Sequence, residues 1–200
     1  MELTATKETI TNKSAIKIKK RDGRLEDLDI DKIHFVVEEA CEGLAGVSSS
    51  QIEINANIQF YDGMTTKEVQ QILVRSANDL ISLEAPNYQY AAARLLSYDV
   101  RKEAHGQYEY MPLLKLILRN IKAGVYDRNI VEKYNKSEIK RLNTWIKRDR
   151  DLDFTYAGLR QVVDKYLVQD RSSGDLFETP QDMYMMIAAT LFADYPAKTR

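Results

Sequence analysis

The chain has 200 residues, of which 44% are hydrophobic and 30% are charged, so it has enough apolar side chains for a core and is too polar for a membrane span. The 29 Lys and Arg residues balance the 30 Asp and Glu residues to a formal net charge of -1, so bulk charge identifies no partner. The single cysteine, Cys41, excludes an intramolecular disulfide and any chemistry within this chain that needs two thiols. Lysines interrupt the N-terminal segment, which therefore lacks the pattern of a signal peptide, and we expect a cytoplasmic protein.

The first predicted element is a β-hairpin over residues 15–29, which follows a flexible polar segment over residues 1–14. Isoleucines alternate with lysines before Asp22 and Gly23, and leucines resume after this pair. An Asp-Gly pair between two patterned segments favours a tight turn, because glycine adopts the positive φ that such turns need.

Two helices are expected after the hairpin. Asp29 or Asp31 caps the first one, whose apolar residues recur at helical spacing until Gly43 ends it. The second helix follows a run of serines and covers residues 50–60.

A third helix is predicted to begin at Thr65, because Thr65 and Glu68 have the spacing of a capping box. Pro86 is placed in the first turn of a fourth helix, which runs to about Gly106. Residues 15–105 therefore form a unit of ordinary small-domain size, a hairpin with four helices.

The second half of the chain, residues 106–200, is also predicted to be helical. Its expected helices cover residues 113–121, 137–147, 155–168 and 179–196. The alternating charges of residues 147–151 indicate a solvated segment, and the turn residues at 170–175 indicate a loop or a short hairpin. The predicted fold class is mainly α (α+β).

The basic strand of the hairpin is the most informative cluster of side chains. Alternation places Lys20 on the face of the isoleucines and Arg21 on the opposite face. A cation at the end of an apolar strand face, near a helix start that carries Lys32, suits a phosphate held against backbone N–H groups. A solvated basic edge that prevents edge-to-edge pairing of strands explains the same pattern.

Few other residues indicate chemistry. Arg94, Tyr98 and Lys102 recur every four residues on one helix face, which suits either base stacking with phosphate binding or an ordinary amphipathic surface. His34 and His105 have no partners at metal-ligand spacing, so we predict no metal site and no catalytic residue. The P-loop, Rossmann and nucleophile-elbow motifs do not occur in the sequence.

The segment KKRDGRLEDLDIDKI resembles the opening of the ATP-cone domain at the N-terminus of ribonucleotide reductase large subunits. The segments IQFYDGMTT, DLISLEAPNYQYAAARLL and KYLVQDR resemble further stretches, in the same order, of the large (alpha) chains of class I, aerobic ribonucleoside-diphosphate reductases. The resemblance implies an ATP cone over residues 15–105, in which the hairpin caps four helices. It also implies that residues 106–200 are the incomplete helical start of a catalytic domain, leading into a barrel.

By this resemblance the cone binds ATP or dATP, with Mg²⁺, at one allosteric site: ATP keeps the reductase active, and dATP switches it off by changing how the subunits assemble. The implied binding residues combine cations for the phosphates with a segment that wraps the nucleotide. The set is Lys20, Arg21, Glu26, Asp27, Leu28, Asp29, Ile30, Asp31, Lys32, Thr66 and Lys102. Thr66 and Lys32 lie at predicted helix N-termini, which favour anions.

The resemblance further implies the protein partners. These are the rest of the large subunit, the radical-generating small subunit and a second large subunit in a homodimer or higher oligomer, with no membrane and no nucleic acid. The family's catalytic cysteines lie downstream of the matched segments, and Cys41 matches none of them. The chain is therefore expected to be inactive by itself, as an N-terminal fragment or as one piece of a split subunit.

Two alternatives stay open from the sequence. A nucleotide-independent helical interaction module would dock an acidic partner or a nucleic acid through the basic hairpin. Alternatively, the cone fold persists while its control by nucleotide has been lost. The retained residues argue against this, and they are Lys20, Lys32, Thr66 and Lys102.

Overall fold

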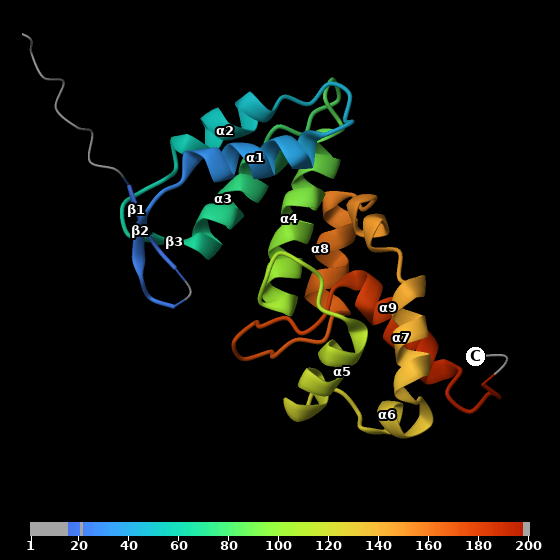
Figure 1. Cartoon of the computed structure of the whole chain (residues 1–200). Helices are drawn as coiled ribbons and strands as arrows, with labels where there is room; N and C mark the ends of the chain where they lie inside the picture. Colours follow the sequence, from blue (N-terminus) through green and yellow to red (C-terminus); the bar gives the residue numbers. More distant parts are fainter. Residues whose placement is uncertain (1–15, 21, 198–200) are drawn as a thin grey trace, which may run out of the picture.

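The computed structural model describes residues 16–20 and 22–197, so the predicted flexible segment 1–14 and Arg21 lie outside the described residues. Its first elements, shown in Figure 1, are strands β1 (Lys17–Lys19) and β2 (Leu25–Asp27), which pair antiparallel as the predicted hairpin. A third short strand, β3 (Met64–Thr65), pairs parallel with β1 and completes a sheet of order β2-β1-β3. Strand β3 is not predictable from the sequence, because its two residues carry no alternating pattern.

The predicted Asp-Gly turn closes the hairpin. The Lys20 carbonyl oxygen accepts a hydrogen bond from the Gly23 N–H at 2.9 Å, and the Lys20 N–H donates to the Arg24 carbonyl at 2.8 Å. Gly23 has φ of 86°, a conformation in which a side chain would be strained, so this glycine makes the turn possible.

Helices α1 (Ile30–Cys41) and α2 (Ser49–Asn57) start where caps were predicted. The Asp29 carboxylate accepts from the Lys32 N–H, so Asp29 and not Asp31 is the N-cap of α1. Ser48 caps α2 in the same way. The second helix ends three residues before the predicted limit.

Helices α3 (Thr66–Asn78) and α4 (Tyr88–His105) complete the first half. Thr65 and Glu68 form the predicted capping box of α3, and Gly106 ends α4 in the left-handed conformation. The prediction for Pro86 was wrong: α4 begins at Tyr88 after the N-cap residue Asn87, and Pro86 lies in the turn before it. The Asn87 side chain donates to the Ala45 carbonyl oxygen instead of capping the helix.

The second half is helical, as predicted. Its elements are α5 (Leu113–Lys122), α6 (Asn129–Lys133), α7 (Lys136–Trp145), the short 3₁₀ helix η1 (Arg148–Leu152), α8 (Tyr156–Lys165) and α9 (Pro180–Leu191). The loop between α8 and α9 is closed by an antiparallel bridge between Gln169 and Leu176, in agreement with the predicted loop or short hairpin. None of the helices in the described part of the chain is long and apolar enough to cross a membrane.

Helix α4 lies at the centre of the molecule and belongs to both halves (Figure 1). Its alanines allow close packing against α1 and α3, and its opposite side packs against α8. Leu95 on α4 and Leu159 on α8 belong to one apolar core, and both are fully buried. A second core lies between α5, α7 and α9. The mainly helical fold with an N-terminal hairpin is thus confirmed.

The prediction that residues 147–151 are a solvated segment holds for the exposed Lys147, Asp149 and Arg150 but was wrong for Arg148 and Asp151. Arg148 donates to the Asp182 carboxylate at 2.5 Å, and the Asp182 side chain is completely buried. Asp182 also lies 3.1 Å from Nε2 of buried His105 at the end of α4. The Met111 N–H donates to Nδ1 of that ring, which puts the ring proton on Nε2, facing the carboxylate. These contacts join α4, η1 and α9.

The two acids at this junction titrate differently. Burial opposes ionisation of Asp182, but the hydrogen bond from His105 and the charge of Arg148 outweigh it and hold the Asp182 pKa below its usual value. For Asp151, which is 1% exposed, burial dominates over the opposing hydrogen bond from Gln181 and raises the pKa to about 7.

We predict that Leu95→Ala lowers the free energy of unfolding by about 2–5 kcal/mol, because it leaves a cavity in the core that both halves share. Urea unfolding followed by circular dichroism measures the change. The matched control is Leu118→Ala, whose side chain is 49% exposed and whose loss changes stability by about 0.5 kcal/mol or less. Equal effects of the two substitutions would contradict the shared core.

We also predict that Asp151→Asn stabilises the protein at about pH 8 by up to about 4 kcal/mol and leaves stability near pH 4 unchanged. A carboxyl whose folded pKa is raised binds its proton more tightly in the folded state, so its contribution to stability is complete at low pH and is lost as the pH rises through about 7. Urea unfolding across this pH range measures the difference. The exposed Asp149→Asn is the control, and an identical pH profile for all three proteins would contradict the assignment.

Candidate functional site

A cleft of about 750 Å³ lies between the small sheet, the start of α3, the end of α4 and the loop between α8 and α9. Cations and helix-start residues from the first half face residues of the second half across it. The lining residues are Lys19, Lys20, Thr65, Thr66, Lys67, Glu103, Arg119, Ala123, Asp175, Leu176 and Phe177. Its concentration of basic side chains around a helix N-terminus suits an anionic ligand.

The start of α3 is held rigidly in this cleft. The Glu68 carboxylate accepts from the Thr65 N–H and hydroxyl, each at 2.7 Å, and the Thr65 hydroxyl oxygen accepts from the Glu68 N–H. The Tyr61 hydroxyl also donates to Glu68, and these bonds, that from Tyr61 foremost, lower the pKa of Glu68 to about 2. The first-turn N–H groups that α3 leaves without helical partners are thereby fixed beside Thr66.

The structure brings Lys20, Glu26, Asp29 and Lys32 into one chain of alternating charges. Lys20 Nζ lies 3.2 Å from Glu26 on the neighbouring strand, on the hairpin face that Ile18 shares, as alternation predicts. The Lys32 ammonium lies 2.8 Å from Asp29, and this hydrogen bond, with the nearby Glu26 charge, raises the pKa of Lys32. The hydrogen bond from the Lys32 ammonium also lowers the pKa of Asp29.

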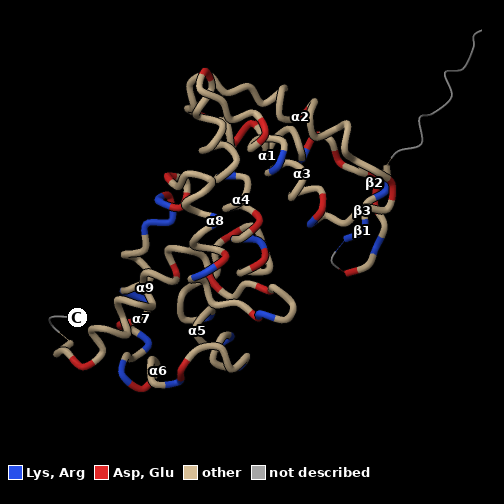
Figure 2. Tube along the Cα trace, turned by 180° about the vertical axis from the view of Figure 1, so that it is seen from behind, with Lys and Arg blue, Asp and Glu red and all other residues tan. Residues whose placement is uncertain are grey.

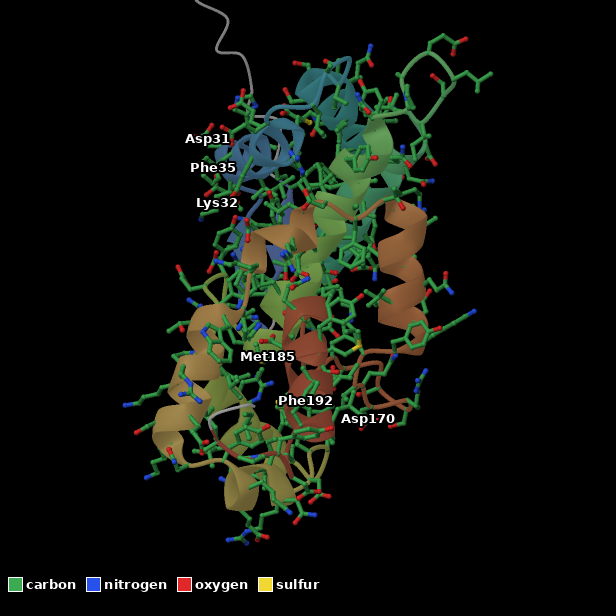
Figure 3. The ribbon with its side chains drawn as sticks, turned by 90° about the vertical axis from the view of Figure 1, so that its right-hand side faces the viewer. Asp31, Lys32, Phe35, Asp170, Met185 and Phe192 are labelled. Carbon is green, nitrogen blue, oxygen red and sulfur yellow. The ribbon has the colours of Figure 1, made fainter. Side chains whose placement is uncertain are left out.

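Other predicted site residues lie elsewhere. Asp27 faces away from Lys20 and pairs with Lys17 at 2.5 Å, and Leu28 packs against the core. Ile30 is half exposed, and Asp31 and Lys32 project from α1 to solvent (Figure 3). Lys102 is exposed on α4, one residue before Glu103.

The helix face carrying Arg94 and Tyr98 has a structural role. Arg94 Nη1 donates to the carbonyl oxygens of Ala40 and Glu42 at the end of α1, at 3.3 and 2.7 Å. The Tyr98 ring is buried in the core. Of the three residues on this face, only Lys102 is exposed, so the face does not form a base-stacking surface.

The basic hairpin is neutralised by its own acids, which weakens the docking alternative. Lys17 pairs with Asp27, Lys20 with Glu26, and Arg24 with Asp22. Figure 2 shows acidic and basic residues interspersed along this part of the chain. A surface in which each of these cations already has an acidic neighbour attracts an extended polyanion only weakly.

The described residues hold no cluster of three or more His, Cys, Asp or Glu side chains suited to a metal ion. His34 contacts Glu53 through Nδ1 and Glu38 through Nε2, at 2.9 and 3.2 Å, which raises its pKa. Cys41 is half-buried, and burial raises the pKa of its thiol to about 11, so this thiol is unreactive.

Five charged residues that line the cleft were not among the predicted site residues. One is Lys19, which alternation places on the hairpin face opposite Lys20. Lys67 follows Thr66 in the first turn of α3, and that position was the available signal. Glu103, Arg119 and Asp175 come from distant segments, and only the packing of the two halves brings them to the cleft. Arg119 donates to the carbonyl oxygens of Ala104 and Phe177, so it also joins α4 to the loop before α9.

Comparison with known protein families gives two matches along the chain. Residues 16–103 match the family described as "ATP cone domain", and residues 152–199 match "Ribonucleotide reductase, all-alpha domain". The first match contains the hairpin and α1 to α3 together with most of α4, and the second contains α8 and α9.

The similar proteins are named as alpha subunits of ribonucleoside-diphosphate reductases, in agreement with the two family matches. The chain is 44% identical over 183 residues to "Ribonucleoside-diphosphate reductase 1 subunit alpha" of Escherichia coli, covering 92% of this chain and 24% of that protein. It is 39% identical over 189 residues to the reductase subunit alpha of Haemophilus influenzae, covering 94% and 25%. The subunit alpha of phage T4 is 40% identical over 183 residues, covering 90% and 24%. The chain thus spans about a quarter of the length of these relatives.

Proposed function

Because the chain belongs to the ribonucleoside-diphosphate reductase alpha subunits as their N-terminal region, with an ATP cone followed by the all-alpha domain, we propose that its cone binds ATP or dATP as an allosteric effector. The regulatory cone is assigned to residues 15–105, and residues 106–200 to the start of the catalytic part. The cleft that Lys20 and Thr66 line is the single observation that carries this function.

The charges around the cleft support a nucleotide polyphosphate as the ligand. Lys20 and Lys67 face it, and the α3 N-terminus with Thr66 adds backbone N–H donors. Of the implied set, Lys20 and Thr66 line the cleft, and Glu26, Asp29 and Lys32 continue from Lys20 as alternating charges. The lining does not include Asp27, Leu28, Ile30, Asp31 or Lys102. Arg21 lies outside the described residues.

Magnesium fits this site as a companion of the triphosphate. The described residues offer no three-acid cluster, so the phosphate oxygens would supply most ligands to the ion. Glu26 and Asp29 lie among the cations of the site, where their carboxylates would accept hydrogen bonds from a ribose or a base.

The proposal for the whole protein follows from its relatives. The complete subunit would reduce ribonucleoside diphosphates to deoxyribonucleotides, in the cytoplasm, together with a small radical-generating subunit and further copies of itself. ATP would keep this activity and dATP would inhibit it. The chain by itself would bind effector without catalysis, because Cys41 is its only cysteine and its thiol is half-buried.

We predict that Lys20→Ala and Lys102→Ala each weaken ATP binding about tenfold, the usual cost of losing a hydrogen bond to a charged group. Titration calorimetry with ATP and with dATP, each with Mg²⁺, measures the affinities. Lys140→Ala, which removes an exposed cation from α7, is the control and leaves them unchanged. The absence of binding of either nucleotide at millimolar concentration would refute the proposed function.

A further inference from the structure

Glu103 connects the cleft to the second half of the molecule through both of its carboxylate oxygens. Oε2 lies 3.1 Å from the Lys67 ammonium, and Oε1 accepts a hydrogen bond from the Leu176 backbone N–H at 3.2 Å. The Glu103 side chain is only 11% exposed, so the carboxylate interacts with these partners largely out of water.

The two partners of Glu103 belong to different parts of the fold. Lys67 is the second residue of α3 and lies beside Thr66, where the phosphates are proposed to bind. Leu176 belongs to the loop between α8 and α9, which extends to the same side of α4 as the small sheet (Figures 1 and 2). One side chain on α4 therefore contacts both the proposed effector site and a loop of the catalytic part.

The loop is held in place at its two ends. The Phe177 N–H donates to the Val168 carbonyl oxygen at 3.0 Å, and the Leu176 side chain is buried in the core. Residues 171–175 between these anchors are exposed, and Asp175 lines the cleft. Loss of the hydrogen bond between the Leu176 N–H and Glu103 would thus move only the short exposed segment and leave the core folded.

We propose that Glu103 is a positioning residue that couples effector phosphates in the cleft to the loop over residues 170–177; this inference rests on the proposed function. A phosphate that binds the Lys67 ammonium competes with Glu103 for the same positive charge. The phosphates also bring negative charge close to Glu103 and Asp175, and like charges repel. Effector binding therefore weakens the Glu103 contact and shifts the loop.

The coupling is reciprocal, because the two equilibria share one carboxylate. A loop position that keeps Glu103 bound to Leu176 and Lys67 opposes phosphate binding, and a loop position that releases Glu103 favours it. Contacts of the loop with other parts of a complete subunit would then change effector affinity by the same factor by which the effector changes those contacts.

Affinity is the first test. Glu103→Gln keeps an acceptor for the Leu176 N–H but removes the charge, so we expect MgATP to bind about fivefold more tightly in titration calorimetry. Lys67→Gln, at an exposed position that leaves the core intact, is expected to weaken binding about fivefold and to abolish the effect of a second Glu103→Gln substitution. Asp164→Asn is the control, since Asp164 pairs with Arg160 and not with Lys67.

Hydrogen exchange of residues 170–177, measured by mass spectrometry with and without MgATP, is the second test. We expect MgATP to increase exchange in the wild type and in Asp164→Asn. The increase should be lost in Glu103→Gln, whose neutral side chain keeps its bond to Leu176, and basal exchange should be raised in Glu103→Ala.

The outcomes separate this inference from the proposed function. A wild-type chain that binds neither nucleotide would overturn both. ATP binding with unchanged exchange in residues 170–177 would overturn the coupling alone, as would tighter binding by Glu103→Gln that retains the wild-type exchange response, because Glu103 would then act only on the phosphates.

Discussion

The packing of α4 is the constraint on which the rest of the structure depends. Helix α4 packs against α1 and α3 and also against α8, and its buried residues, Leu95 among them, belong to the core that all four helices share. A closely packed interior is hard to compress, so packed helices move as rigid bodies. A helix that packs in both halves therefore passes a movement of one half on to the other. The C-terminal turn of α4 is therefore where the two halves of the chain meet, and it carries Glu103 and His105.

His105 and Glu103 join the two halves through different kinds of interaction, one fully buried and the other at the edge of the cleft. His105 contacts Asp182 within a buried cluster that also includes Arg148. Breaking these contacts would leave an uncompensated charge buried, which costs a large free energy. Glu103 lies at the edge of the cleft, where its partner Lys67 is half exposed and an entering anion competes for it. The first contact suits a permanent connection and the second suits a connection that a ligand changes. Because Glu103 and His105 lie on one turn of α4, the same helix end carries both kinds of connection.

The cleft is preorganised by compensating charges. Lys20 and Lys67, which line the cleft, are held by Glu26 and Glu103, so these cations are positioned before a ligand arrives. A triphosphate bound there, as proposed, would exchange these partners at sites whose geometry is already set, and its binding would cost less entropy. The same pairing of charges weakens the attraction of the hairpin for polyanions such as nucleic acids.

The sequence by itself determined the local structure and two residues of the candidate site, Lys20 and Thr66. The Asp-Gly turn, the Thr65 capping box and the basic residue Lys20 each depend on neighbours within a few positions, so pattern and propensity suffice for them. Tertiary structure alone decided that β3 pairs with β1 and that the charged 147–151 segment is partly buried against Asp182. It also decided that Glu103 meets Leu176 across 73 residues of chain. These contacts form only after distant segments pack, and no local pattern encodes which acid on a helix will find a partner there.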